Sequence, residues 1–164
     1  MKIDQIHHVA FRCRDAKETV EWYEKNLKMG FVLAIAEDRV PSTHEPDPYI
    51  HVFLDAGAGN VLAFFELPTK PDMGRDPNTP EWVQHIAFKV RDRDTLLQFK
   101  SHLEANGVDV LGVTDHSIFH SIYFFRISIT SQDHLLTTLK QSIISMKKFF
   151  LRSLFSSKEL NIIN

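Results

Sequence analysis

Two segments of the chain carry apolar residues at the spacing of an amphipathic helix. In the first segment these residues are Val20, Tyr23 and Leu27. Asp15 is placed to cap the start of this helix, and Glu18 stands at the capping-box position three residues later. Gly30 is placed to end the helix in the left-handed conformation. The pattern therefore predicts one helix with both of its ends marked.

The second segment follows the same plan. Its apolar stripe consists of Leu96, Phe99 and Leu103. Asp92 precedes the stripe as the predicted N-cap, and Gly107 follows it as the predicted stop. A second helix of similar length is therefore expected.

Short segments rich in β-branched and aromatic residues follow each helix, as is typical of strands. They are roughly Phe31–Ala36, Tyr49–Asp55 and Asn60–Leu67 after the first helix, and Val108–Val113 and Phe119–Phe125 after the second. A further strand precedes each helix, beginning near His8 and His85. The predicted order is a strand, a helix and then strands, repeated once.

An internal repeat supports this order. The segment His8–Asp15 reads HVAFRCRD, and His85–Asp92 reads HIAFKVRD, 77 residues later. Gly30 and Gly107 keep the same separation. Repeats of this length indicate a duplicated structural unit. We therefore expect an α+β fold in which two tandem βαβββ modules form a curved mixed sheet around a cleft.

The repeat also sets the expected domain limits. Residues 1–67 form the first module, residues 68–81 a proline-rich linker, and residues 82–133 a second module whose last strand is doubtful. Residues 134–164 are predicted to form a basic amphipathic helical tail, because apolar residues recur there at helical spacing. These are Leu136, Leu139, Ile143, Met146, Phe150 and Leu154. The tail is interpreted as a helix packed on the module or partly disordered, or as a partner-binding or membrane-surface helix.

Composition adds one unusual feature, nine histidines against a single cysteine. Histidine is the commonest protein ligand of metals and titrates near neutral pH. The formal net charge of −2 does not favour nucleic acid as a partner. The lone Cys13 and the absence of a signal peptide or a long apolar run favour a cytoplasmic protein.

The matched histidines are the first candidates for chemistry. His8 and His85 occupy equivalent positions, and a pseudo-two-fold axis relating the modules would bring both rings to one cleft. Glu66 lies in an apolar strand, where a carboxylate is costly to bury without a cation or another partner. The alternative is that Glu66 pairs with an arginine or lies at an exposed strand end. Imidazoles with carboxylates suit Fe²⁺, Mn²⁺, Zn²⁺ or Ni²⁺.

These features together resemble the vicinal-oxygen-chelate superfamily, which includes glyoxalases, bleomycin-resistance proteins and extradiol dioxygenases. The resemblance covers about residues 1–125. It implies a divalent metal ion held by the first and last strands of each module, which points to His8, Glu66 and His85 as ligands. The ion would chelate a small oxygen-rich substrate and act as a Lewis acid.

A second signature resembles the extradiol ring-cleavage pattern of a histidine, a short spacer and a tyrosine. By that resemblance His116 would be an acid or base, and Tyr123 would bind substrate. His120 is a weaker candidate in the same segment. The alternative interpretation is an ordinary loop histidine and a strand aromatic.

The family pattern breaks after Tyr123. No Asp-Pro-x-Gly turn follows, and no glutamate stands where the last metal ligand is expected. Counting along the chain places Asp133 near that position as a possible substitute. A frameshift, a different exon or a true variant would each explain the change that begins near Arg126.

Three functions fit these observations. The leading one is a metal-dependent lyase or ring-cleaving dioxygenase acting on a small oxygen-rich molecule. The alternatives are a metal-free, antibiotic-type small-molecule binding protein of the same fold, and a catalytically impaired copy. A small-molecule substrate is the expected partner, and the modules could pair within one chain or across a homodimer.

Overall fold

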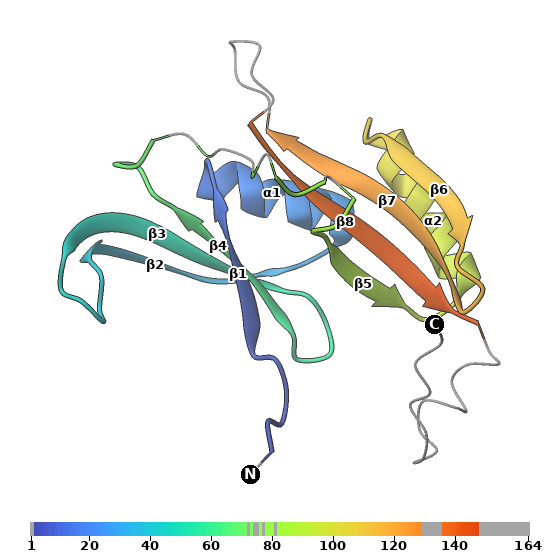
Figure 1. Cartoon of the computed structure of the whole chain (residues 1–164), viewed down its shortest axis with the longest axis horizontal. Coiled ribbons are helices and arrows are strands. Elements are labelled where there is room, and N and C mark those ends of the chain that lie inside the picture. Colours follow the sequence, from blue (N-terminus) through green and yellow to red (C-terminus); the bar gives the residue numbers. More distant parts are fainter. Residues whose placement is uncertain are drawn as a thin grey trace. The chain divides into compact units, whose positions relative to one another are not determined.

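The computed structural model describes residues 2–71, 73, 76, 78–80, 82–128 and 136–147. Two compact units account for the chain (Figure 1). Among the described residues, one unit is formed by residues 2–73 and the other by residues 76–127 and 138–147. Each unit contains one of the two predicted helices and one four-stranded sheet. The two predicted βαβββ modules are thereby confirmed.

The first unit contains one helix and four strands. Their bounds are β1 (His8–Cys13), α1 (Ala16–Leu27), β2 (Phe31–Arg39), β3 (Pro46–Asp55) and β4 (Val61–Glu66). The strand order in the sheet is β1-β4-β3-β2, with β1 parallel to β4 and the other pairs antiparallel. A tight turn joins β3 to β4, and Gly57 and Gly59 both adopt positive φ there.

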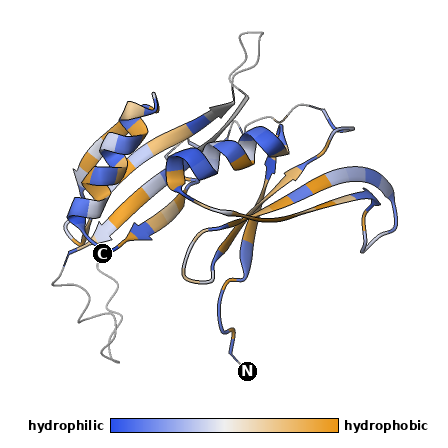
Figure 2. Cartoon of the chain, turned by 180° about the vertical axis from the view of Figure 1, so that it is seen from behind, coloured by the Kyte–Doolittle hydropathy of each residue, from blue (hydrophilic) through white to orange (hydrophobic). Residues whose placement is uncertain are grey.

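Strand alternation gives the first sheet two chemically different faces. One face packs on α1, where the Tyr23 ring is fully buried 5.0 Å from the Phe64 ring. Leu54 and Leu62 complete this core and are almost fully buried. The turns of α1 are mainly hydrophilic, whereas the strands alternate between hydrophobic and hydrophilic positions (Figure 2). The sheet face opposite α1 therefore carries the other set of side chains.

The two ends of α1 were predicted with different success. Asp15 is the N-cap, and its side chain accepts a hydrogen bond from the backbone N–H of Glu18, as expected. The predicted stop at Gly30 is wrong, because Lys28 adopts the left-handed conformation with a φ of 59°. The helix already ends at Leu27, and the Lys28 N–H is bonded back to the Tyr23 carbonyl. The αL turn therefore falls on the first residue after the helix, before the glycine is reached.

The second unit repeats this plan. Its elements are β5 (Ile86–Val90), α2 (Arg93–Ala105), β6 (Val110–Asp115), β7 (Phe119–Ser128) and β8 (Leu136–Met146). The strand order is β5-β8-β7-β6, with β5 parallel to β8 and β6 antiparallel to β7. Asp92 caps α2 through the Thr95 N–H, and Gly107 follows the helix with a φ of 78°, both as predicted.

The helix predicted over residues 134–164 is wrong for Leu136–Met146, which form strand β8. This strand lies between β5 and β7, and so occupies the place that β4 holds in the first unit (Figure 1). On one face of β8, Gln141, Ile143 and Ser145 are buried, whereas on the other face Ser142 is buried and Ile144 is half-buried. Polar residues at buried positions remove the usual alternation of apolar and polar residues, which left a coincidental helical spacing as the visible signal. Residues 148–164 of the predicted tail lie outside the described residues.

Neither helix in the described part of the chain is long and apolar enough to span a membrane.

Candidate functional site

His8 begins β1 on the sheet face opposite α1. Its ring lies 6.0 Å from the Phe53 ring, measured between centroids, and its Nδ1 is 2.8 Å from Nδ1 of His7. His8 is exposed, so its ring is accessible to a ligand.

His51 on β3 shares this face and was not singled out from the sequence. Its ring centroid lies 6.3 Å from that of His8, and its ring stacks on Phe65 with centroids 3.6 Å apart. Burial, and secondarily the charge of His8, lowers the pKa of His51 below its usual value. Its buried Nε2 has no hydrogen-bond partner among the described residues. The alternation of β3, with Tyr49 and Phe53 on the same face, was the signal that could have identified it.

Glu66 does not lie near His8 in the first sheet. In the parallel pair of β1 and β4, His8 lies beside Val61, whereas Glu66 lies beside Cys13. The two side chains therefore lie about 16 Å apart along the strands, at roughly 3.3 Å per residue. They also lie on opposite faces of the sheet, because five positions is an odd number of steps.

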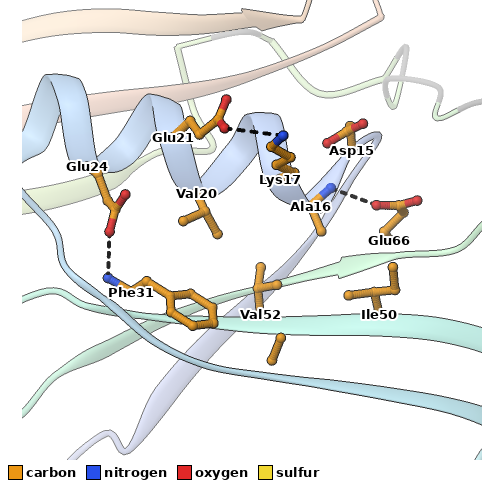
Figure 3. A pocket seen from close by; sticks show the side chains of 11 residues that line it. Asp15, Ala16, Lys17, Val20, Glu21, Glu24, Phe31, Ile50, Val52 and Glu66 are labelled. Carbon is orange, nitrogen blue, oxygen red and sulfur yellow. Dashed lines mark hydrogen bonds and ion pairs between the residues drawn. The ribbon is translucent and has the colours of Figure 1, made fainter.

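The Glu66 carboxylate instead contacts the start of α1. Its Oε2 accepts a hydrogen bond of 2.7 Å from the backbone N–H of Ala16 (Figure 3). A carboxylate there satisfies an orphan N–H and interacts favourably with the helix dipole. This contact explains a carboxylate at the end of an apolar strand without a metal ion. On β4, the side chains that share a face with His8 are Val61, Ala63 and Phe65, none of which is a metal ligand.

In the second unit, His85 stands directly before β5. Its Nδ1 is 3.2 Å from the Val83 carbonyl oxygen, and its ring lies 6.1 Å from the Tyr123 ring, measured between centroids. A backbone carbonyl held by one ring nitrogen fixes the orientation of an imidazole and leaves the other nitrogen for a ligand.

His116 and Tyr123, the two residues of the ring-cleavage signature, do lie together. The Tyr123 hydroxyl is 3.0 Å from His116 Nε2, and the Ser121 hydroxyl is 2.9 Å from the same nitrogen. The His116 ring also stacks on Phe119, with ring centroids 4.6 Å apart. His120 is directed elsewhere, with its Nε2 3.7 Å from the Asp115 carboxylate. The described contacts thus bring His85, Tyr123, His116 and Ser121 into one cluster.

Lys140 of β8 joins this cluster. Its Nζ lies 4.6 Å from the centre of the Tyr123 ring, a cation–π contact. The β5–β8 register pairs Ile86 with Gln141, which carries Lys140 to the position beside His85. Strand β8 contains no carboxylate. Asp133, the candidate substitute ligand, lies outside the described residues.

These donors fit a divalent metal ion only in part. His8 with His51 in the first unit, and His85 in the second, supply imidazoles, which suit first-row transition metals. No group of three or more histidine, cysteine, aspartate or glutamate side chains within the described ranges could hold an ion. The missing donor type is a carboxylate on the face that carries the histidines.

The model of the glyoxalase/bleomycin resistance protein/dioxygenase superfamily matches residues 5–138. The chain belongs to this superfamily. The match extends beyond Phe125, where the sequence resemblance stopped, and reaches the start of β8.

Known superfamily proteins resemble the chain at low sequence identity. MhqA of Bacillus subtilis (strain 168), named as a ring-cleaving dioxygenase, is 27% identical over 117 residues, or 70% of this chain. The match covers only 34% of MhqA, so the chain spans about a third of that relative.

Solved structures confirm the fold. A glyoxalase/bleomycin resistance protein/dioxygenase domain from Frankia sp. EAN1pec superposes with a TM-score of 0.63 at 14% identity, covering 89% of this chain and 100% of that one. The fosfomycin resistance protein FosX from Listeria monocytogenes, complexed with Mn(II) and sulfate, superposes with a TM-score of 0.57 at 14% identity. That match covers 90% of this chain and 97% of FosX.

Proposed function

We propose that the chain is a metal-dependent enzyme of the glyoxalase or ring-cleaving dioxygenase type, acting on a small oxygen-rich substrate. The observation that carries this proposal is the contact of 3.0 Å between Tyr123 and His116, with the His85 ring beside the tyrosine. The name of MhqA and the Mn(II) ion of FosX support this choice of chemistry.

The proposed metal ligands are His8 and His85, with Asp133 as the candidate carboxylate. A bound divalent ion would polarise the substrate oxygens and lower the pKa of a substrate hydroxyl. Glu66 is not carried into this ligand set, because its carboxylate lies on the α1 face of the sheet.

The remaining residues would handle protons and orient the substrate. His116 can act as a proton acceptor at Nε2, the nitrogen that contacts the Tyr123 and Ser121 hydroxyls. Burial lowers the pKa of His51 and so favours its neutral form beside His8. Phe53 and Phe65 flank His51 and would exclude water from an aromatic substrate.

Elemental analysis of protein purified without chelators tests the ligand set. We expect bound divalent metal in the parent protein and almost none in the double variant His8→Ala/His85→Ala. The matched control is Glu66→Gln, which we expect to keep the metal, since a glutamine oxygen can still accept from Ala16. A full equivalent of metal in the double variant would refute the ligand assignment.

A metal-free binding protein is the second candidate, and Lys140 favours it. An ammonium beside His85 repels a divalent cation, and β8 supplies no carboxylate to offset that repulsion. The same lysine would attract an anionic small molecule to the Tyr123 cluster. This candidate, like an impaired copy of the enzyme, predicts no co-purified metal. Binding of a small molecule that is insensitive to substitution of His8 and His85 would distinguish the binding protein.

A further inference from the structure

A groove on the α1 side of the first unit lies outside the proposed catalytic face. It has a volume of about 600 Å³, within the range of small-molecule sites. The described residues that line it belong to α1 with its N-cap, β2, β3 and the end of β4. His8 and His51 lie on the opposite face of the sheet, so the groove is separate from them.

The floor of the groove is apolar. Val20 comes from α1, Ala34 from β2, and Ile50 and Val52 from β3. Phe31 forms one wall, and its side chain is 49% exposed although it is a large aromatic residue (Figure 3). An apolar ligand body would cover this surface and remove it from water.

A carboxylate stands at each end of the apolar floor. Glu66 lies near the first turn of α1, and Glu24 lies two turns later, beside Phe31 (Figure 3). Each carboxylate uses one oxygen structurally: Glu66 Oε2 accepts from the Ala16 N–H, and Glu24 Oε1 accepts from the Phe31 N–H at 3.1 Å. In the part of the chain that is described, the second oxygen of each carboxylate has no hydrogen-bond partner.

The charges around the groove are mostly negative. Its rim also carries Asp15 and Glu21, and Lys17, the one cation among the described lining residues, lies 3.8 Å from Glu21. An ionised carboxylate accepts hydrogen bonds but cannot donate them, and it carries negative charge. Its unused oxygen therefore favours a ligand group that donates hydrogen bonds and is positively charged. An exposed aromatic ring beside Glu24 also attracts cations through its π face.

We propose that this groove is a second binding site, and that its ligand is an organic cation with an apolar body, such as an arylalkyl amine. The apolar body lies against Val20, Val52 and Phe31. The ammonium donates to the free oxygen of Glu24 or Glu66. The site requires neither a metal ion nor the histidines, so its failure and that of the proposed enzyme function are distinguishable.

Titration calorimetry with three probes that share one apolar body tests the proposal: 4-phenylbutylamine, 4-phenylbutanol and 4-phenylbutyric acid. We expect the amine to bind about threefold more tightly than the alcohol, as roughly 0.6 kcal/mol for one exposed ion pair implies. The acid should bind most weakly. Raising the salt concentration should reduce the difference in affinity between the amine and the alcohol, because these carboxylates are partly exposed. Equal affinity for amine and alcohol would overturn the proposal.

Substitutions locate the binding. Glu24→Gln and Glu66→Gln keep an acceptor for the backbone N–H groups while removing charge, so each should weaken amine binding by about threefold. Glu18→Gln removes the same charge from α1 outside the groove and should leave the affinity unchanged. Ala34→Trp should abolish binding of all three probes by filling the groove. Unaltered amine binding in Ala34→Trp, or equal weakening by Glu18→Gln, would refute the location.

Discussion

Strand alternation determines which side chains of the first unit can meet. His8 and Glu66 were suggested as partners by residue type, yet an odd number of strand positions separates them onto opposite faces. His51, which attracted no attention in the sequence, shares a face with His8 because β3 lies beside β4 in the sheet. His116 and Tyr123, which the resemblance singled out, are in contact because both lie within one hairpin whose short spacing fixes their distance.

Lys140 is the residue that most directly opposes a metal ion in the second unit. We predict that Lys140→Met raises the affinity for a divalent metal by about fivefold, corresponding to roughly 1 kcal/mol of repulsion removed. Metal affinity is measured by competition with a chromogenic chelator. Lys147→Met is the matched control, because that lysine is paired with the Asp115 carboxylate at 2.7 Å. An unchanged affinity in Lys140→Met would show that the ion, if bound, does not lie beside this lysine.

The N-cap of α2 makes this helix sensitive to acid. Hydrogen bonds from the Thr95 side chain and backbone, with a smaller one from Arg91, lower the pKa of Asp92 to about 2. A lowered folded-state pKa stabilises the fold above the unfolded-state pKa, near 4, and this contribution is lost as the pH falls towards 2. We therefore predict that the denaturant midpoint decreases between about pH 4 and pH 2.

Two variants separate this cap from other acid effects. Asp92→Asn retains a capping oxygen without a charge and should remove most of the decrease in the denaturant midpoint at low pH. Thr95→Val removes the hydroxyl contact of 2.7 Å and should make that decrease smaller. Urea unfolding followed by circular dichroism at each pH gives the midpoints. An unaltered pH slope in Asp92→Asn would contradict the assignment to this carboxylate.

Strand β8 is the element on which the second sheet depends. Ile143 is 2% exposed and pairs in register with Phe88 of β5. We predict that Ile143→Ala lowers the free energy of unfolding by about 2–5 kcal/mol, the usual cost of truncating a buried aliphatic side chain. Ile144→Ala should cost less, because that side chain is only half-buried. Equal, small effects in urea unfolding would indicate that residue 143 is not in a sheet core.

The sequence predicted most of the molecule where its signals were local or repeated. The duplicated segments, helix caps and turn glycines all mark short-range structure, and the two modules follow from them. Two failures have different causes. Lys28, not Gly30, adopts the left-handed conformation after α1, and β8 shows no apolar–polar alternation because polar Gln141 and Ser145 occupy buried positions. The candidate site was predicted less completely, since facing and register depend on strand order. For example, Ser142 pairs with Ala87 in the second sheet, just as Ala63 pairs with Ala10 in the first. Only the observed strand pairing reveals this correspondence.

The second sheet can be completed only late in synthesis, because its central strand β8 is its last strand in the sequence. Strand β5 leaves the ribosome early, but the neighbour it pairs with is β8, which begins at Leu136. Until β8 emerges, β5 has no partner in its sheet, and β7 lacks the neighbour on its β5 side. A nascent chain, or a product of premature termination before residue 136, therefore exposes two unpaired strand edges at once, a state prone to association. Chaperone dependence and proteolytic clearance of truncated forms would then be governed by this one central strand.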